Sequence, residues 1–236
     1  MSDVAVAPPP PPPESPPETF DFAKPFTFVF DDPEWISKIL LGAVFSLASI
    51  FLVGIFFING YVAKMVRQVI DGVQRPLPDW SGLGDYFVEG VRLFVIIVIY
   101  FIPLWFLALM TVPFSIIANI EDLHDVARLP AALMSAGVSC LIFPLSLLMM
   151  VWVPAALLRA VAKQDFSAAF DFRGIANFIR ANTLNYLLAV LIMLVARFIA
   201  GLGLLLCCVG VFATAFWAAL VSAHAFAQAY RLASER

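Results

Sequence analysis

The chain has 236 residues, of which 62% are hydrophobic and only 13% are charged, and its formal net charge is −3. A soluble globular domain has roughly 45–50% apolar and about 25% charged residues, so this composition argues against a water-soluble fold. The acidic balance also excludes the basic footprint of a nucleic-acid-binding protein. The relevant unit is therefore a stretch of roughly 20 apolar residues, which as a helix crosses a bilayer core about 30 Å thick.

Residues 1–19, MSDVAVAPPPPPPESPPET, form a proline-rich tail without a basic start or an apolar run. We expect neither a secretory signal nor a transit peptide there. Proline tracts are typical of disordered or polyproline-like segments, which act as solvated spacers or as ligands of SH3-type or WW-type grooves. The sequence thus predicts this tail, one transmembrane helical domain (20–231) and a short cytoplasmic tail (232–236).

Five apolar stretches follow the tail, and each is predicted to cross the membrane as a helix. They are Ile36–Ile58, Val91–Ile120, Ala131–Leu158, Thr183–Ala200 and Leu204–Phe226. The last two belong to one run that would measure roughly 70 Å as a helix, too long for one crossing, so we place a turn at Gly201–Gly203. Four prolines are expected to kink the second and third helices: Pro103, Pro113, Pro144 and Pro154.

The cations predict how these helices are threaded. With five crossings, ten cations fall on one side: Lys64, Arg67, Arg75, Arg92, Arg159, Lys163, Arg173, Arg180, Arg231 and Arg236. Lys24, Lys38, Arg128 and Arg197 fall on the other side. By the positive-inside rule, the N-terminus is outside, and the C-terminus and the 60–90 loop are cytoplasmic. The fold class is an all-α polytopic transmembrane bundle of about five spans with interfacial amphipathic segments.

One polar segment between the first two apolar stretches is RPLPDWSGLGDYFVEG, residues 75–90. Its prolines favour an extended turn, and its aromatic residues are typical of a membrane interface. We expect Trp80 and Tyr86 to rest among lipid headgroups. Trp35, at the start of the first helix, is expected to anchor there as well.

A second such segment is DFSAAFDFRGIANFIRANT, residues 165–183. Here Phe166 and Phe170 alternate with cations such as Arg173, as in a helix lying flat on an anionic leaflet. The alternative is a loop packed on the helices of the protein itself.

A faint internal repeat links FDFAKPFTFVF, from Phe20, to FDFRGIANFIR, from Phe170. Both segments lead into an apolar helix, although a Phe-rich chain produces such matches easily. If the repeat is real, both segments lie on the same side of the membrane. That would require Ile36–Ile58 to be a re-entrant hairpin with the N-terminus inside, giving six membrane segments.

The order of several short motifs resembles that of membrane proteins grouped as domain of unknown function 4013. The motifs are DPEW, KILLG, NGY followed by VAKMVRQVIDG, PLPDW with GDYFVEG, YFIP, and a closing FWAALVSAHAFAQAYR. The resemblance extends from about Phe20 to Arg231. It implies a bacterial or archaeal polytopic membrane protein and supplies no catalytic residues.

Arg197 lies inside the apolar run LIMLVARFIAGLG, where a cation is unfavourable at mid-bilayer. It is about one turn from the expected turn at Gly201, so it can snorkel to the surface or pair with Glu121, Asp122 or Asp125. A gate or a contact with a substrate anion is the functional alternative.

Arg92 has the same alternatives at the start of the second helix. It lies close in sequence to Asp85 and Glu89, on the inner side, and structural pairing there is the simpler interpretation.

Two histidines are the candidate ligands. His224 lies near the inner end of the last helix beside Ser222 and Gln228, where it could bind a metal or a pigment, relay protons or form an interhelical hydrogen bond. His124 lies in the acidic link EDLHDVARLP, which fits a solvated loop or a loose cation site but no firm metal pattern. We predict no metal and no cofactor, with His224 the candidate cofactor ligand.

The cysteines and enzyme motifs add little. Cys140, Cys207 and Cys208 lie in or beside apolar stretches, and neighbouring helical residues such as Cys207 and Cys208 are poorly placed for a disulfide. The sequence has no CxxC, phosphate-binding glycine loop, HExxH or GxSxG.

These observations favour a non-enzymatic integral protein of the bacterial cytoplasmic (inner) membrane. A scaffold or accessory subunit leads, because the chain lacks the concentrated intramembrane charges expected of a coupled transporter. A small-solute transporter or channel-like protein is the alternative. A membrane-embedded enzyme or pigment- or metal-binding subunit is third, and needs Arg197, His224 or the acidic link to converge. The expected partners are the lipid bilayer and other membrane proteins, with no nucleic acid.

Overall fold

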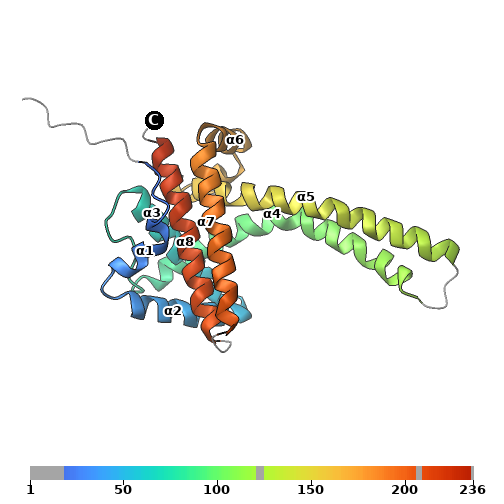
Figure 1. The fold of residues 1–236 in the computed structure, drawn as a ribbon, viewed down its shortest axis with the longest axis horizontal. Helices are drawn as coiled ribbons and strands as arrows, with labels where there is room; N and C mark the ends of the chain where they lie inside the picture. Colours follow the sequence, from blue (N-terminus) through green and yellow to red (C-terminus); the bar gives the residue numbers. More distant parts are fainter. Residues whose placement is uncertain (1–18, 121–124, 206–208, 235–236) are drawn as a thin grey trace, which may run out of the picture.

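The computed structural model describes residues 19–120, 125–205 and 209–234, and within these ranges the chain forms helices and no strand (Figure 1). The elements are α1 (Lys24–Thr27), η1 (Phe28–Asp31), α2 (Trp35–Ala48), η2 (Ser49–Phe51), α3 (Val53–Ile70), α4 (Leu83–Ala118), α5 (Asp125–Lys163), η3 (Ser167–Phe170), α6 (Phe172–Ala181), α7 (Thr183–Leu202), η4 (Gly203–Leu205) and α8 (Val209–Ser234).

Five of the described helices are long and apolar enough to cross a membrane. They are Val53–Ile70, Leu83–Ala118, Val126–Lys163, Thr183–Leu205 and Gly210–Ser234. A sixth segment is possible by length and composition, because Lys24–Asp31 and Trp35–Phe51 pass the same test together, although they are bent by 109°. The predicted class, an all-α protein with about five candidate spans, is confirmed.

The single helix predicted over Ile36–Ile58 is wrong. The chain breaks after η2, where Leu52 adopts a left-handed conformation with a φ of 66°. Gly54 then allows α2 and α3 to approach closely, since a Cβ at this position would lie 1.9 Å from the carbonyl oxygen of Phe45. The first apolar stretch is therefore a helical turn-back rather than one crossing.

A tight antiparallel crossing joins α3 to α4, and two glycines make it possible. A Cβ at Gly60 would lie 1.9 Å from the carbonyl oxygen of Tyr86, and a Cβ at Gly90 would lie 1.6 Å from that of Phe56. Only hydrogen fits at both positions, so the two backbones are in direct contact, as small residues permit in membrane helix pairs.

Helices α4 and α5 form a long hairpin that projects away from the rest of the molecule (Figure 1). Both run unbroken through their prolines, which include Pro103 and Pro144. Beyond residue 100 of α4 no residue is buried, and among residues 126–150 of α5 only Ala131 is buried. We call residues 101–118 and 126–150 the arm.

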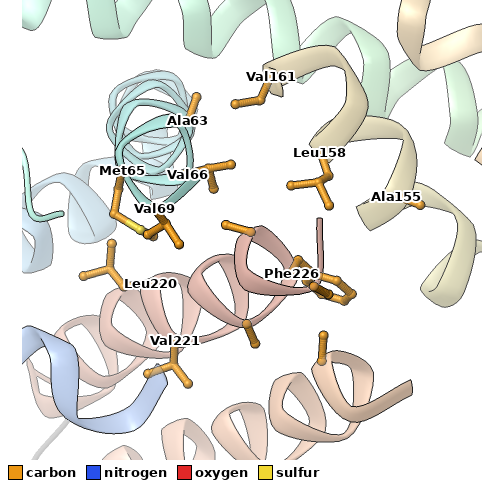
Figure 2. Close-up of a cluster of buried hydrophobic side chains, with 14 of the residues drawn as sticks. Ala63, Met65, Val66, Val69, Ala155, Leu158, Val161, Leu220, Val221 and Phe226 are labelled. Atoms are coloured by element: carbon orange, nitrogen blue, oxygen red, sulfur yellow. The ribbon is translucent and has the colours of Figure 1, made fainter. Parts of the chain in front are cut away.

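The core is built around α8, which contacts α2, α3, α5 and α7. Figure 2 shows side chains from three of these helices meeting in one apolar cluster. The cluster includes Ala63, Met65, Val66 and Val69 of α3, Ala155, Leu158 and Val161 of α5, and Leu220, Val221 and Phe226 of α8.

The N-terminal segment lies at the same end of the molecule as the loop after α3 and the end of α8. The side-chain amide of Gln228, in the orientation that suits its neighbours, donates to the carbonyl oxygen of Asp21 at 3.1 Å and accepts from its N–H at 2.7 Å. Lys38 pairs with Asp79 at 3.0 Å. The N-terminal segment and this loop, which the sequence predicts on opposite sides of the membrane, are therefore in contact, because α2 and α3 fold back on each other at Leu52.

Candidate functional site

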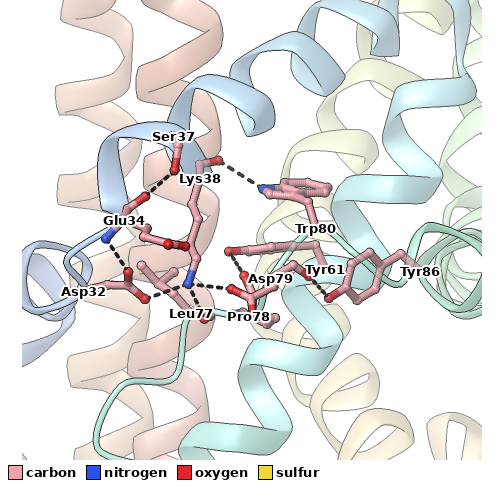
Figure 3. Close-up of polar contacts among 10 residues, drawn as sticks. All are labelled: Asp32, Glu34, Ser37, Lys38, Tyr61, Leu77, Pro78, Asp79, Trp80 and Tyr86. Atoms are coloured by element: carbon pink, nitrogen blue, oxygen red, sulfur yellow. Dashed lines mark hydrogen bonds and ion pairs between the residues drawn. The ribbon is translucent and has the colours of Figure 1, made fainter.

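The extended segment Pro76–Trp80, which we call the strap, lies between α2, α3 and α8 (Figure 3). Pro76, Leu77 and Pro78 are buried, Trp80 is half-buried and Asp79 is exposed. Tyr61 donates to the carbonyl oxygen of Pro78 at 2.8 Å, and the indole N–H of Trp80 donates to that of Lys38 at 3.2 Å. Proline has no N–H, so a segment with two prolines carries fewer donors that need partners when buried.

Lys38 is the centre of the polar contacts around the strap. Its Nζ lies 2.8 Å from Asp32 Oδ2, 3.0 Å from Asp79 Oδ1 and 3.1 Å from the carbonyl oxygen of Leu77. The Lys38 and Asp32 side chains are only 9% and 7% exposed, whereas that of Asp79 is 73% exposed. Three ammonium protons thus meet three acceptors. The cluster ties the N-terminal segment, α2 and the strap together and leaves no donor for chemistry.

Aromatic rings pack around Trp80, the last residue of the strap. The Trp80 ring stacks on Tyr61 at 4.2 Å and on Phe45 at 4.7 Å between centroids. Tyr86 is 2% exposed and donates to the carbonyl oxygen of Asp79 at 2.5 Å. Tyr86, expected among lipid headgroups, is therefore enclosed by the protein, whereas Trp80 is half-buried. Trp35 is half-buried and meets Phe30 edge-on at 5.0 Å.

The segment 165–183 packs on the helices of the protein itself through one face. Phe170 stacks on Tyr100 of α4 at 5.6 Å, and Phe166 lies 5.4 Å from Phe170. Ile175 and Phe178 of α6 are buried.

The outer face of α6 remains exposed, with Arg173 and Arg180 on it. The sequence left two alternatives for this segment: a helix lying on an anionic leaflet, or a loop packed on the helices of the protein. The inner face of α6 packs on the protein, and its outer face carries cations of the kind that an anionic leaflet attracts.

An ion pair fixes the start of α6 against the end of α5. Asp171 caps α6 by accepting from the Gly174 N–H at 2.9 Å, and Arg159 donates to the same carboxylate at 2.7 Å and to the Gly174 carbonyl oxygen at 3.1 Å. The Gly174 N–H, together with the charge of Arg159, holds the pKa of the Asp171 carboxyl below its usual value.

Arg92 lies in a second charged cluster, which joins α3, α4 and α5. It is 3.6 Å from Glu89, which also pairs with Arg67, and Arg67 donates to the carbonyl oxygen of Val161 at 3.3 Å. The described contacts of Arg92 thus involve Glu89 and not Asp85. All three helices reach this cluster near the end of the molecule that carries the loops.

His224 is buried beside a polar pocket of about 560 Å³ that also involves Lys24, Arg75, Gln228 and Arg231. Its ring stacks on Phe28 at 4.3 Å between centroids. Its Nδ1 has no hydrogen-bond partner among the residues that the structure describes.

A metal ion held by protein side chains alone needs several donors. Across residues 19–120, 125–205 and 209–234 no group of three His, Cys, Asp or Glu side chains is placed to hold a metal ion. His124, Cys207 and Cys208 lie outside the described residues.

Arg197 lines a different cavity, of about 270 Å³, between α3, α4, α5, α7 and α8. Its other polar side chains are Asn59 and Ser222, and the remaining wall is apolar. Asn59 Nδ2 is buried and has no hydrogen-bond partner within the described ranges. Arg197 and His224 therefore do not converge on one pocket.

The structure does not describe the acidic side chains expected to pair with Arg197. Glu121 and Asp122 lie outside the described residues, as does the side chain of Asp125. The helix ends that flank them lie at the far tip of the arm, away from α7 (Figure 1). In the part of the chain that the structure describes, Arg197 has no ion pair.

Sequence reasoning did not single out Lys38, Asp79 or Asn59. The available signal was Lys38 itself, the one charge within its apolar stretch, because a lone cation among apolar residues needs a carboxylate nearby. Asp79 could be assigned to it only with knowledge that the chain folds back at Leu52.

Five candidate spans around an apolar core, with buried polar groups gathered in a few clusters, define a polytopic α-helical membrane protein. The chain belongs to the family described as protein of unknown function (DUF4013), whose model matches residues 43–209. The family resemblance is thereby confirmed, although DPEW, KILLG and the closing FWAALVSAHAFAQAYR lie outside the matched range. No curated protein and no solved structure matches the chain.

Proposed function

We propose that this protein is a non-catalytic membrane scaffold or accessory subunit that holds other membrane proteins through its arm. The observation that carries the proposal is the exposure of the arm, whose two helices contact little but each other. Its outward side chains include Trp105, Phe106, Leu109, Leu133, Leu141 and Phe143, all more than half exposed. Such a surface suits helix packing within a bilayer.

The shape of the arm supports the same role. Near its tip the two helices leave an open hollow of about 690 Å³ lined partly by small residues, among them Ser115, Ala118, Ala132, Ser135 and Ala136. Small residues let the backbone of another helix approach closely. Gly137, the residue after Ala136 in α5, is also open, because a Cβ there would meet nothing within 4 Å.

We further propose that the end carrying the loops faces the cytoplasm of a bacterial cell. Lys24 lines a pocket at this end together with Arg75 and Arg231, so it joins the ten cations already assigned to it. A larger excess of cations on one side strengthens the positive-inside argument.

The test is affinity purification of the full chain from native membranes in mild detergent, followed by quantitative mass spectrometry. A stoichiometric partner is expected with the wild-type chain and should be lost with Ala136→Trp, which fills the hollow. Val88→Trp is the matched control, because Val88 is 70% exposed on α4 but outside the arm. Recovery of the wild-type chain alone after cross-linking would overturn the scaffold role.

A second candidate, a small-solute transporter or channel-like protein, is favoured by the cavity beside Arg197, whose wall includes Pro154 of α5. Proline within a membrane helix can free a backbone carbonyl oxygen to line a passage. Flux of small anions into proteoliposomes, compared between the wild-type chain and Arg197→Gln, would test this candidate. Equal flux with and without protein would remove it.

A further inference from the structure

The cavity beside Arg197 has an apolar wall, one buried donor without a partner, Asn59 Nδ2, and one exposed cation, Arg197. The wall is formed by side chains from several helices, including Val62 of α3, Leu93 of α4, Leu157 of α5 and Phe226 of α8. Its volume of about 270 Å³ is that of a compact pocket, and its apolar lining favours hydrocarbon over a sugar or a nucleotide.

Two groups at this cavity can donate hydrogen bonds to a ligand: the side-chain amide of Asn59 and the guanidinium of Arg197. Asn59 Nδ2 is buried with no hydrogen-bond partner, and Arg197 has no ion pair, among the residues that the structure describes. A buried amide donor and a cation inside a candidate span are each unfavourable until they meet an acceptor. Ser222 also lines the cavity, and its hydroxyl donates to the carbonyl oxygen of Ala218 at 2.6 Å. Among the described residues its oxygen does not accept a hydrogen bond from Asn59 Nδ2, which stays without a partner.

We propose that this cavity binds an anionic amphiphile, with a carboxylate or phosphate head that accepts hydrogen bonds from Arg197 and Asn59 and a hydrocarbon chain against the apolar wall. Guanidinium groups form strong, charge-assisted hydrogen bonds with such heads. The hydrocarbon chain of a neutral amphiphile could occupy the apolar wall, but its head would leave the Arg197 charge unpaired. The ligand is therefore either a free fatty acid or an anionic phospholipid, and it binds independently of the scaffold role.

Equilibrium binding of radiolabelled probes to the full chain in phosphatidylcholine nanodiscs tests the proposal. Dodecanoate and dodecyl phosphate are expected to bind at least tenfold more tightly than dodecanol. Arg197→Gln should weaken dodecanoate binding about tenfold and leave dodecanol binding unchanged. Arg173→Gln is the matched control, since Arg173 is exposed on α6, outside the cavity. Tighter binding of dodecyl phosphate than of dodecanoate would identify a phospholipid head as the source, and the reverse order a fatty acid.

Two further variants keep the test decisive if Arg197→Gln does not fold. Asn59→Leu should weaken binding of both anionic probes, and Ala219→Trp, which fills the wall, should weaken binding of all three probes. Melting temperatures in detergent verify that each variant is folded. Equal affinities of the wild-type chain for dodecanol and dodecanoate would overturn the proposal and mean that Arg197 only snorkels to the surface.

Discussion

Lys38 and Asp32 form an ion pair of 2.8 Å across the sharp bend between η1 and α2, and both side chains are almost completely buried. Lys38→Met leaves the Asp32 carboxylate buried without its partner, so we expect a loss of about 3 kcal/mol in unfolding free energy. Asp79→Asn should lose only about 0.5 kcal/mol, because Asp79 is mostly exposed. Denaturant unfolding in detergent micelles measures both changes.

The control for this pair is the double variant Lys38→Met, Asp32→Leu. Because it removes both buried charges, it should recover part of the stability lost by Lys38→Met alone. Equal losses for Lys38→Met and Asp79→Asn would show that the buried pair has no special weight.

The contact of Gly90 with the backbone of Phe56 predicts a severe defect in Gly90→Ala. A methyl group 1.6 Å from a carbonyl oxygen forces α3 and α4 apart, so we expect loss of the monodisperse folded peak in size-exclusion chromatography.

Gly84→Ala provides the comparison within the same helix. A Cβ at Gly84 meets nothing within 4 Å, and alanine is the better helix former, so this variant should be as stable as the wild type or slightly more so. A Gly90→Ala protein as stable as Gly84→Ala would contradict the close crossing.

The Asp171 carboxyl predicts a pH dependence of stability. Its folded-state pKa is lowered, first by the Gly174 N–H, so its contribution is present above the unfolded-state value of about 3.9 and lost as the pH falls through the folded-state pKa. Wild type should melt above Asp171→Asn at pH 7, and the gap should close in strong acid. Equal melting temperatures of the wild type and Asp171→Asn at pH 7 would contradict this contribution.

The position of the N-terminal segment predicts that Phe22 and Val73 lie on the same side of the membrane, opposite Leu204. All three are exposed, so a single cysteine at each can be labelled with an impermeant maleimide in intact cells and in inverted vesicles. The background requires serine at Cys140, Cys207 and Cys208. Labelling of positions 22 and 73 from opposite sides would disprove the turn-back at Leu52.

Long apolar runs made four of the five spans predictable, since burying a helical backbone in hydrocarbon requires uninterrupted apolar length. The break at Leu52 was not predictable, because SLASIFLVG contains no proline, charge or paired turn residues. Only Gly54 hinted at a close approach, and glycine is common in membrane helices for other reasons.

The contacts of the strap with distant helices were not predictable either, for a related reason. A tryptophan and a tyrosine between prolines look the same in sequence whether they face headgroups or pack within the protein. What decides the outcome is whether other helices cover them, and Trp80 is covered by Phe45 and Phe216, which lie 35 residues before it and 136 residues after it. Such distant contacts leave no local pattern.

The ring of Phe216 has a bearing on how the chain assembles during synthesis. It lies 5.6 Å from Tyr61 and 5.9 Å from Trp80, and a Cβ at Gly42 would fall 2.1 Å from it. A ribosome makes α8 after α2, α3 and the strap have all emerged. The N-terminal half therefore stays incompletely packed until α8 is made, and a chain cut short before α8 would keep Trp80 on Tyr61 and Phe45 but lose its contact with Phe216.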